Sequence, residues 1–158
     1  MSPFIPEVSD VMTLSPHFIA ATDSLAEAKS LMQEYGIRHL PVMHDGELVG
    51  VLSDRDLHRA VALKGAAPED IGIEEVMTLD PYSVAPSALL NVVARTMAER
   101  KVGSAIVMDR GAVLGVFTVT DALHALASSL EGRAVERVYE SVLTEPPMGG
   151  RAKEPDLP

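Results

Sequence analysis

Gly50-Val51-Leu52-Ser53-Asp54-Arg55-Asp56-Leu57 is the stretch that decides the fold, because it returns as Gly115-Val116-Phe117-Thr118-Val119-Thr120-Asp121 after 65 residues. In each copy, a strand-like apolar run ends in a hydroxyl residue, and a carboxylate follows three residues after that hydroxyl. This spacing is typical of the point where a strand ends and a helix begins.

The whole chain around this stretch is duplicated. A shift of 65 residues aligns 11–57 with 76–122 without a gap, and 15 of the 47 aligned residues are identical. Apolar periodicity and turn residues predict the order β-α-β-β-α in each copy. The predicted fold class is therefore α+β, with two repeats packed through their sheets about a pseudo-twofold axis.

Local signals predict where the elements begin and end. Ser24 and Glu27 have the spacing of a capping box, so we expect a helix to begin there, and Pro86-Ser87 is expected to open its counterpart. Pro41 indicates that its strand lies at an edge or carries a bulge. The predicted divisions are repeat 1 at 8–64, a linker at 65–73, repeat 2 at 74–130, and 131–158 with a helix over 134–143 and a disordered tail.

Composition narrows the function classes. The chain has 23 acidic and 13 basic residues, a net charge of −10, which disfavours nucleic-acid phosphates. It has no cysteine, which excludes disulfides, thiolate zinc sites and cysteine nucleophiles. No segment resembles a signal peptide or reaches the roughly 20 apolar residues of a membrane span, so we expect a soluble cytoplasmic protein.

The motif at Ser53 and Asp56 has two interpretations. The pair could be a capping box, or the carboxylate could hold a ribose while the hydroxyl and the helix N-terminus receive phosphate. Arg55 lies in the first helical turn, where a cation costs about 0.3–1 kcal/mol, and an anionic ligand would account for it. Arg38 and His39 precede a strand of the same repeat. An isolated pair of this kind could simply be polar surface residues, but beside Ser53, Arg55 and Asp56 they are candidate phosphate ligands.

Catalytic and metal chemistry find little support in the sequence. We find no nucleophile beside an orienting base, so we expect no enzyme activity and no catalytic residue. The histidines lack metal-ligand spacing apart from a loose pair at His39 and His44, so we expect no metal site.

Three motifs together resemble a known family. They are Val-Met-Thr with a following proline, which begins at Val11 and again at Val76, the strand at 36–42, and the stretch at 50–57 with its second copy. They are similar to paired cystathionine-β-synthase-type (CBS) domains, a Bateman module, over about residues 8–130. The resemblance implies two clefts between the repeats that bind adenosine-containing ligands such as AMP, ADP, ATP, NAD or S-adenosylmethionine.

The resemblance also implies the residues of each cleft, in which the aspartate holds the ribose and the hydroxyl lies by the phosphate. The first cleft would use Arg38, His39, Ser53, Arg55 and Asp56, with Thr78, Val102, Gly103 and Ser104 around the base. The second would use Thr118, Thr120 and Asp121, with Thr13, Ile37 and Arg38 near the base. Because Gly103-Ser104 replaces Arg38-His39, we expect a phosphate-bearing nucleotide in the first cleft and a less charged ligand, or none, in the second.

The expected function is regulatory. Ligand binding would favour one orientation of the two repeats and transmit this change to an unknown partner protein. We expect a homodimer that interacts with neither nucleic acid nor membrane. The alternative is a constitutive dimerisation or protein-interaction module with vestigial ligand sites, in which the 134–143 helix is a docking element.

Overall fold

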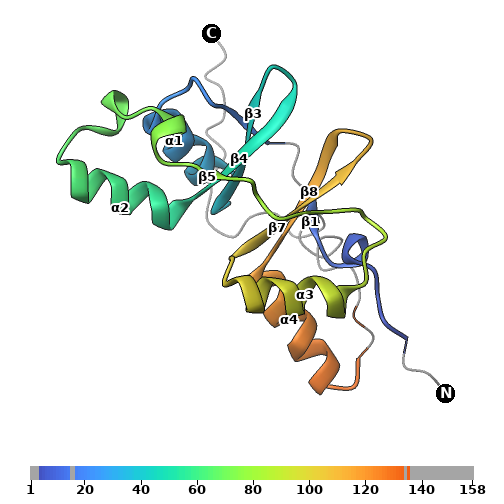
Figure 1. Ribbon diagram of the computed structural model, residues 1–158. Helices are drawn as coiled ribbons and strands as arrows, with labels where there is room; N and C mark the ends of the chain where they lie inside the picture. Colours follow the sequence, from blue (N-terminus) through green and yellow to red (C-terminus); the bar gives the residue numbers. More distant parts are fainter. Residues whose placement is uncertain (1–3, 15–16, 134, 136–158) are drawn as a thin grey trace, which may run out of the picture.

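The computed structural model describes residues 4–14, 17–133 and 135, which form two similar lobes (Figure 1). The first copy contains η1 (Val8–Asp10), β1 (Thr13–Leu14), β2 (Ile19–Ala20), α1 (Leu25–Tyr35), β3 (His39–His44), β4 (Glu47–Ser53) and α2 (Asp54–Lys64). The second contains η2 (Pro68–Asp70), η3 (Ile73–Glu75), β5 (Thr78–Leu79), β6 (Ser83–Val84), α3 (Leu90–Arg100), β7 (Ser104–Asp109), β8 (Ala112–Thr118) and α4 (Val119–Leu130). The predicted α+β class is confirmed.

The two sheets exchange their first strands. One sheet has the order β2-β3-β4-β5 and the other β1-β8-β7-β6, so β1 and β5 each join the sheet of the other copy. In both sheets the exchanged strand is antiparallel to the long strand that leads to the duplicated motif, β8 or β4. The exchange was not predicted, and it places Thr13 and Thr78 next to the motif of the opposite copy.

Two glycines permit this exchange. A Cβ at Gly50 would lie 2.8 Å from the carbonyl oxygen of Thr78, and one at Gly115 would lie 2.5 Å from that of Thr13. Real Cβ atoms do not approach backbone oxygens this closely, so a side chain at either position would push the exchanged strand away. The duplicated glycine in the motif is therefore explained by the strand that crosses it.

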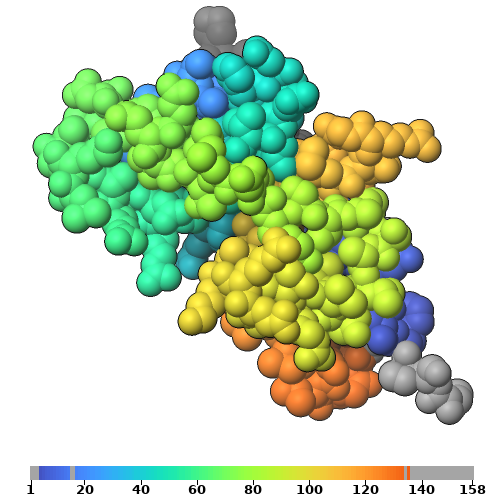
Figure 2. Space-filling view, viewed as in Figure 1, coloured from blue at the N-terminus to red at the C-terminus, as the bar shows by residue number. Residues whose placement is uncertain are grey.

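Each lobe has its own hydrophobic core, and both cores include exchanged residues. Val8, Val11 and Met12 pack with Phe117 and the rest of the second core. Ile71 and Ile73 pack into the first core in the same way. Figure 2 shows the blue N-terminal segment against the lobe coloured yellow to orange. Neither repeat therefore completes its core alone.

The exchanged segments also explain why one helix start was predicted wrongly. Ser24 caps α1 in a capping box with Glu27, as expected. However, α3 begins at Leu90, not at Pro86-Ser87, and its N-cap residue Leu89 has no side-chain hydrogen bond. The carbonyl of Pro6 accepts the hydrogen bond of Leu90 N at 2.9 Å. Backbone from the N-terminal segment thus replaces the missing polar cap.

Pro41 does not mark an edge strand, because β3 lies between β2 and β4. The two-residue β2 pairs only with Val42 and Met43 and leaves Pro41 uncovered on that side. The register with β4 shifts between Val42 and Met43, so the alternative of a bulge is confirmed. The helix predicted over 134–143 and the tail beyond it lie outside the described residues, apart from Val135.

Candidate functional site: two clefts between the repeats

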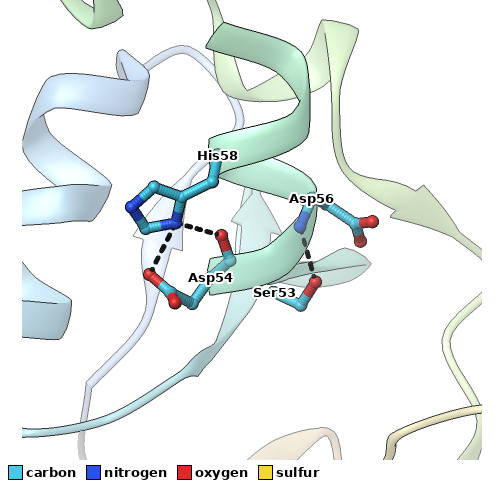
Figure 3. Close-up of polar contacts among 4 residues, drawn as sticks. All are labelled: Ser53, Asp54, Asp56 and His58. Atoms are coloured by element: carbon cyan, nitrogen blue, oxygen red, sulfur yellow. Dashed lines mark hydrogen bonds and ion pairs between the residues drawn. The ribbon is translucent and has the colours of Figure 1, made fainter. Parts of the chain in front are cut away.

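The first motif holds its carboxylate in an open position. Ser53 has extended backbone as the N-cap of α2, and its Oγ accepts a hydrogen bond from Asp56 N at 3.1 Å. Within the described part of the chain, the Asp56 carboxylate accepts no hydrogen bond, so this is half of a capping box. Figure 3 shows that carboxylate directed away from Ser53, while Asp54 contacts His58.

In the second motif both oxygens of the carboxylate accept hydrogen bonds. Asp121 Oδ2 accepts hydrogen bonds from Thr118 N at 2.9 Å and from Thr118 Oγ1 at 3.1 Å. The other oxygen, Oδ1, accepts one from Thr13 Oγ1 at 3.0 Å, across 108 residues of sequence. Asp121 is only 7% exposed. This carboxylate closes a full capping box and also holds the exchanged strand β1.

The larger cleft, of about 550 Å³, lies at the first motif. All residues that the sequence assigned to the first cleft line it: Arg38, His39, Ser53, Arg55, Asp56, Thr78, Val102, Gly103 and Ser104. The prediction did not include Val51, Asp54, Asp80, Pro81, Tyr82 and Lys101, which also line it. The 65-residue alignment pairs Tyr82 with His17, which lines the other cleft, but the sequence suggested neither residue.

The smaller cleft, of about 390 Å³, lies at the second motif. It is lined by all of the residues predicted for it: Thr13, Ile37, Arg38, Thr118, Thr120 and Asp121. Leu14, His17, Gly36, His39 and Val116 line it too, and the sequence did not suggest them. Each cleft therefore gathers residues from both repeats.

Arg38 and His39 form a wall that the two clefts share. The Arg38 carbonyl accepts a hydrogen bond from Asp54 N at 2.8 Å, which fixes this wall to the start of α2. The backbone of Gly103, from the other repeat, packs against the His39 ring, because a Cβ at Gly103 would lie 3.5 Å from His39 Nε2. His39 had been predicted for the first cleft alone, and its place between the clefts comes from the packing of the repeats.

Burial lowers the pKa of the His39 imidazole below its ordinary value of 6.5. The negative charges of Asp121, Asp56 and Asp54 raise this pKa, and the positive charge of Arg38 lowers it further. His39 is thus a neutral group near neutral pH that feels the carboxylate of both motifs. An anion bound beside it would favour its protonated form.

The number of cations distinguishes the clefts. The larger one is lined by the cations Arg38, Arg55 and Lys101 together with the carboxylates of Asp54, Asp56 and Asp80. On the smaller cleft's lining, Arg38 is the one lysine or arginine and Asp121 the one carboxylate. Lys101 has a φ of 55°, a left-handed conformation that a non-glycine residue adopts at a cost, and Gly36 takes its place in the first repeat. The second repeat therefore has a cation at a left-handed position that glycine would adopt at a lower cost.

Other kinds of site are not apparent in the described ranges. Among residues 4–14, 17–133 and 135, no group of three or more His, Cys, Asp or Glu side chains could hold a metal ion. In the same part of the chain, every helix is too short or too polar to cross a membrane.

Curated relatives of the chain include a much longer enzyme and a protein of similar length. Inosine-5′-monophosphate dehydrogenase of Korarchaeum cryptofilum is 32% identical over 74% of this chain, which spans only 22% of that enzyme. The CBS domain-containing protein YhcV of Bacillus subtilis is 25% identical over 83% of this chain and 94% of YhcV.

Solved structures share the architecture. A Vibrio cholerae protein designated acetoin utilization protein AcuB superposes with a TM-score of 0.72 and is 33% identical, covering 82% of this chain and 97% of that one. The CBS domain pair of protein MJ0100, in complex with 5′-methylthioadenosine and S-adenosyl-L-methionine, gives 0.70 at 26% identity, covering 79% and 98%.

The family model of the CBS domain matches the chain twice, at residues 8–63 and 73–128. Each match contains one copy of the motif and one of the two carboxylates described above. The chain therefore belongs to the CBS domain family.

Proposed function

We propose that this protein is a regulatory sensor that binds an adenosine-containing ligand in the larger cleft. The observation that carries the proposal is the open carboxylate of Asp56, which is half-buried and lines the cleft beside Ser53. A carboxylate with two free oxygens can accept hydrogen bonds from the 2′- and 3′-hydroxyls of a ribose. Asp121 already accepts three hydrogen bonds with its two oxygens, so it cannot accept from both ribose hydroxyls while these bonds hold.

The cations favour a phosphate-bearing ligand in this cleft. Arg38 and Arg55 lie with Ser53 and the N-terminus of α2, a place suited to an anion. AMP, ADP and ATP are therefore the first candidates, with NAD and S-adenosylmethionine as the others. Support for an adenosine ligand also comes from the MJ0100 domain pair, which was solved with two adenosine compounds. The smaller cleft, with fewer cations, would take a less charged ligand or none.

Regulation would follow from the position of the cleft between the repeats. A ligand there would contact Ser53 and Asp56 of one repeat and Val102 and Gly103 of the other. Ligand binding would favour the orientation in which both contacts form, and such coupling is typically about 1–3 kcal/mol. The proposed role is binding without turnover, in the cytoplasm, with transmission to an unidentified partner protein.

A homodimer is favoured by an exposed apolar stripe on α4. Val119, Leu123, Leu126 and Leu130 are 50%, 59%, 53% and 79% exposed, and their spacing places them along one side of the helix. A second copy of the chain would cover this stripe. Light scattering should then show a dimer that Leu123→Glu dissociates, while Leu63→Glu, at an exposed leucine on α2, leaves it intact.

Titration calorimetry with AMP, ADP, ATP, NAD and S-adenosylmethionine tests the sensor proposal. We expect micromolar affinity for at least one of them, about −8 kcal/mol. The bound compound should be recovered chemically unchanged after incubation. If none of the five compounds binds measurably, the sensor function is overturned and the alternative remains, a constitutive interaction module with vestigial clefts.

A further inference from the structure

Two stacked side-chain pairs occupy equivalent positions in the two repeats. His17 stacks on Tyr35, with ring centroids 3.6 Å apart and an angle of 17° between the planes. The Arg100 guanidinium carbon lies 4.8 Å from the centroid of the Tyr82 ring. A shift of 65 residues superimposes these pairs, and neither is explained by the carboxylate motifs.

Each pair connects a cleft to a helix end. Tyr82 and His17 each come just before a short strand, β6 or β2, and line the larger and the smaller cleft respectively. Arg100 and Tyr35 are the last residues of α3 and α1. The partner at the helix end therefore limits the orientations of the ring that lines the cleft.

The Tyr82 ring is close in sequence to the groups expected around an adenine base. It is half-buried, and its carbonyl accepts a hydrogen bond from Ile106 N at 2.8 Å, which fixes its backbone to β7. Thr78 lies four residues before Tyr82 in the sequence. Val102 lies two residues after Arg100, which stacks on the Tyr82 ring. Ser53 and Arg55, the expected phosphate ligands, come from the other repeat.

We propose that Tyr82 is the residue on which the base stacks in the larger cleft, and that Arg100 is a positioning residue that holds its ring. This inference rests on the proposed adenosine ligand. A purine stacks on an aromatic face without needing specific hydrogen bonds. A guanidinium over a tyrosine ring is attracted by the ring electrons and keeps the ring from rotating away. Tyr82 would then select for ligands that carry an aromatic base.

Calorimetry of Tyr82→Leu and Tyr82→Phe with two probes tests the stacking role. We expect Tyr82→Leu to weaken AMP binding about tenfold, since base stacking on an aromatic residue commonly contributes at least that factor. Tyr82→Phe should restore the affinity, because the ring is kept. Ribose 5-phosphate, which lacks the base, should compete for the cleft equally well in the wild type and in Tyr82→Leu. Arg100→Leu should weaken AMP binding by a smaller factor.

Tyrosine fluorescence gives an independent readout, because the chain has no tryptophan and three tyrosines. AMP should change the emission of the wild type, and Tyr82→Leu should abolish most of that change. Tyr35→Leu, which removes the tyrosine of the equivalent pair, is the matched control and should keep it.

The outcomes separate the two proposals. A wild type that binds none of the adenosine compounds overturns the sensor function and the stacking role together. A wild type that binds AMP, with Tyr82→Leu binding it equally well, overturns the stacking role alone. Equal weakening of AMP and ribose 5-phosphate would also overturn it, because Tyr82 would then only support the shape of the cleft.

Discussion

The two clefts are built from equivalent elements, but the carboxylates of their motifs differ in hydrogen bonding and burial. Asp121 binds Thr118 and Thr13 with both oxygens and is almost fully buried. Asp56, at the matching position, leaves its carboxylate open toward a cleft that carries two further cations, Arg55 and Lys101. One copy of the motif therefore has a structural carboxylate, and the other has an open carboxylate for which we propose a ligand-binding role.

The division does not follow from the motif residues themselves. Thr13 and Thr78 are equivalent and identical, yet the structure gives Thr13 a hydrogen bond to Asp121 and records none between Thr78 and Asp56 in the described part of the chain. The comparison therefore makes distinct predictions for substitutions at the two aspartates.

The largest expected effect is that of Asp56→Ala on ligand affinity. We expect AMP binding to weaken about 30- to 150-fold, or about 2–3 kcal/mol, because hydrogen bonds to a charged group are lost. Stability should change little, since the backbone bond of residue 56 to Ser53 Oγ remains. Calorimetry and thermal unfolding measure the two quantities. Retained affinity with a lowered melting temperature would mean that Asp56 is only a cap.

Asp121→Ala should show the opposite pattern. We expect the free energy of unfolding to fall by about 2 kcal/mol, because Thr118 N, Thr118 Oγ1 and the Thr13 hydroxyl all lose the carboxylate that accepts their hydrogen bonds. Urea denaturation measures the loss, and Thr13→Val combined with Asp121→Ala should be less than additive. AMP affinity should fall far less than in Asp56→Ala. A large loss of affinity with unchanged stability would remove the distinction between the two aspartates.

Arg55→Thr gives the first motif the residue of the second. We expect AMP affinity to fall about tenfold, the size of one charge-assisted hydrogen bond, while adenosine binding is unchanged. Calorimetry with both ligands at two salt concentrations measures this, and the salt dependence of AMP binding should decrease. An equal loss for adenosine would show that Arg55 shapes the cleft and does not contact phosphate.

The smallest expected effect concerns pH and the wall between the clefts. Burial lowers the pKa of His39 below 6.5 in the folded chain, so the unfolded chain binds more protons as pH falls through 6.5. The wild type should therefore lose stability relative to His39→Gln over that range. Urea denaturation of both proteins at several pH values measures the difference, and parallel curves would contradict this prediction.

Protonation of His39 should also be coupled to AMP binding. A phosphate beside His39 would raise its pKa against the effect of burial, so binding should take up a proton near neutral pH. Calorimetry in buffers of different ionisation enthalpy measures the uptake, which His39→Gln should reduce. The facing charges of Asp121, Asp56, Asp54 and Arg38 are unchanged in that comparison.

Much of the architecture could be predicted because the duplication aligns every element with a second copy. The fold class follows from two β-α-β-β-α patterns, and the predicted cleft residues do lie together, although their binding role stays a prediction. The exchanged strands were missed because β1 and β5 pair with β8 and β4 of the other copy, and a local sequence pattern does not record pairing with a distant strand. The start of α3 was missed because its cap is backbone of Pro6, distant in sequence.

The different use of the two aspartates was predicted only in part, because the cations favoured a phosphate at the first motif and a less charged ligand, or none, at the second, but the hydrogen bonds of Asp121 were not foreseen. Both follow a hydroxyl residue by three positions, and both face an exchanged threonine. The observed difference is the hydrogen bond that Asp121 accepts from Thr13, and a sequence pattern does not contain it. The residues that do differ, Arg55 against Thr120, indicated the correct cleft for the cations.

The strand exchange has a consequence for the origin of the molecule. A half-length ancestor with the same segments could not have completed its sheet, since the strand that covers Gly50 or Gly115 comes from the other copy. Two such chains would have had to exchange these strands in a dimer to complete their sheets. With both copies in one chain, each exchanged strand always meets its partner, so the two copies of the motif can carry different residues.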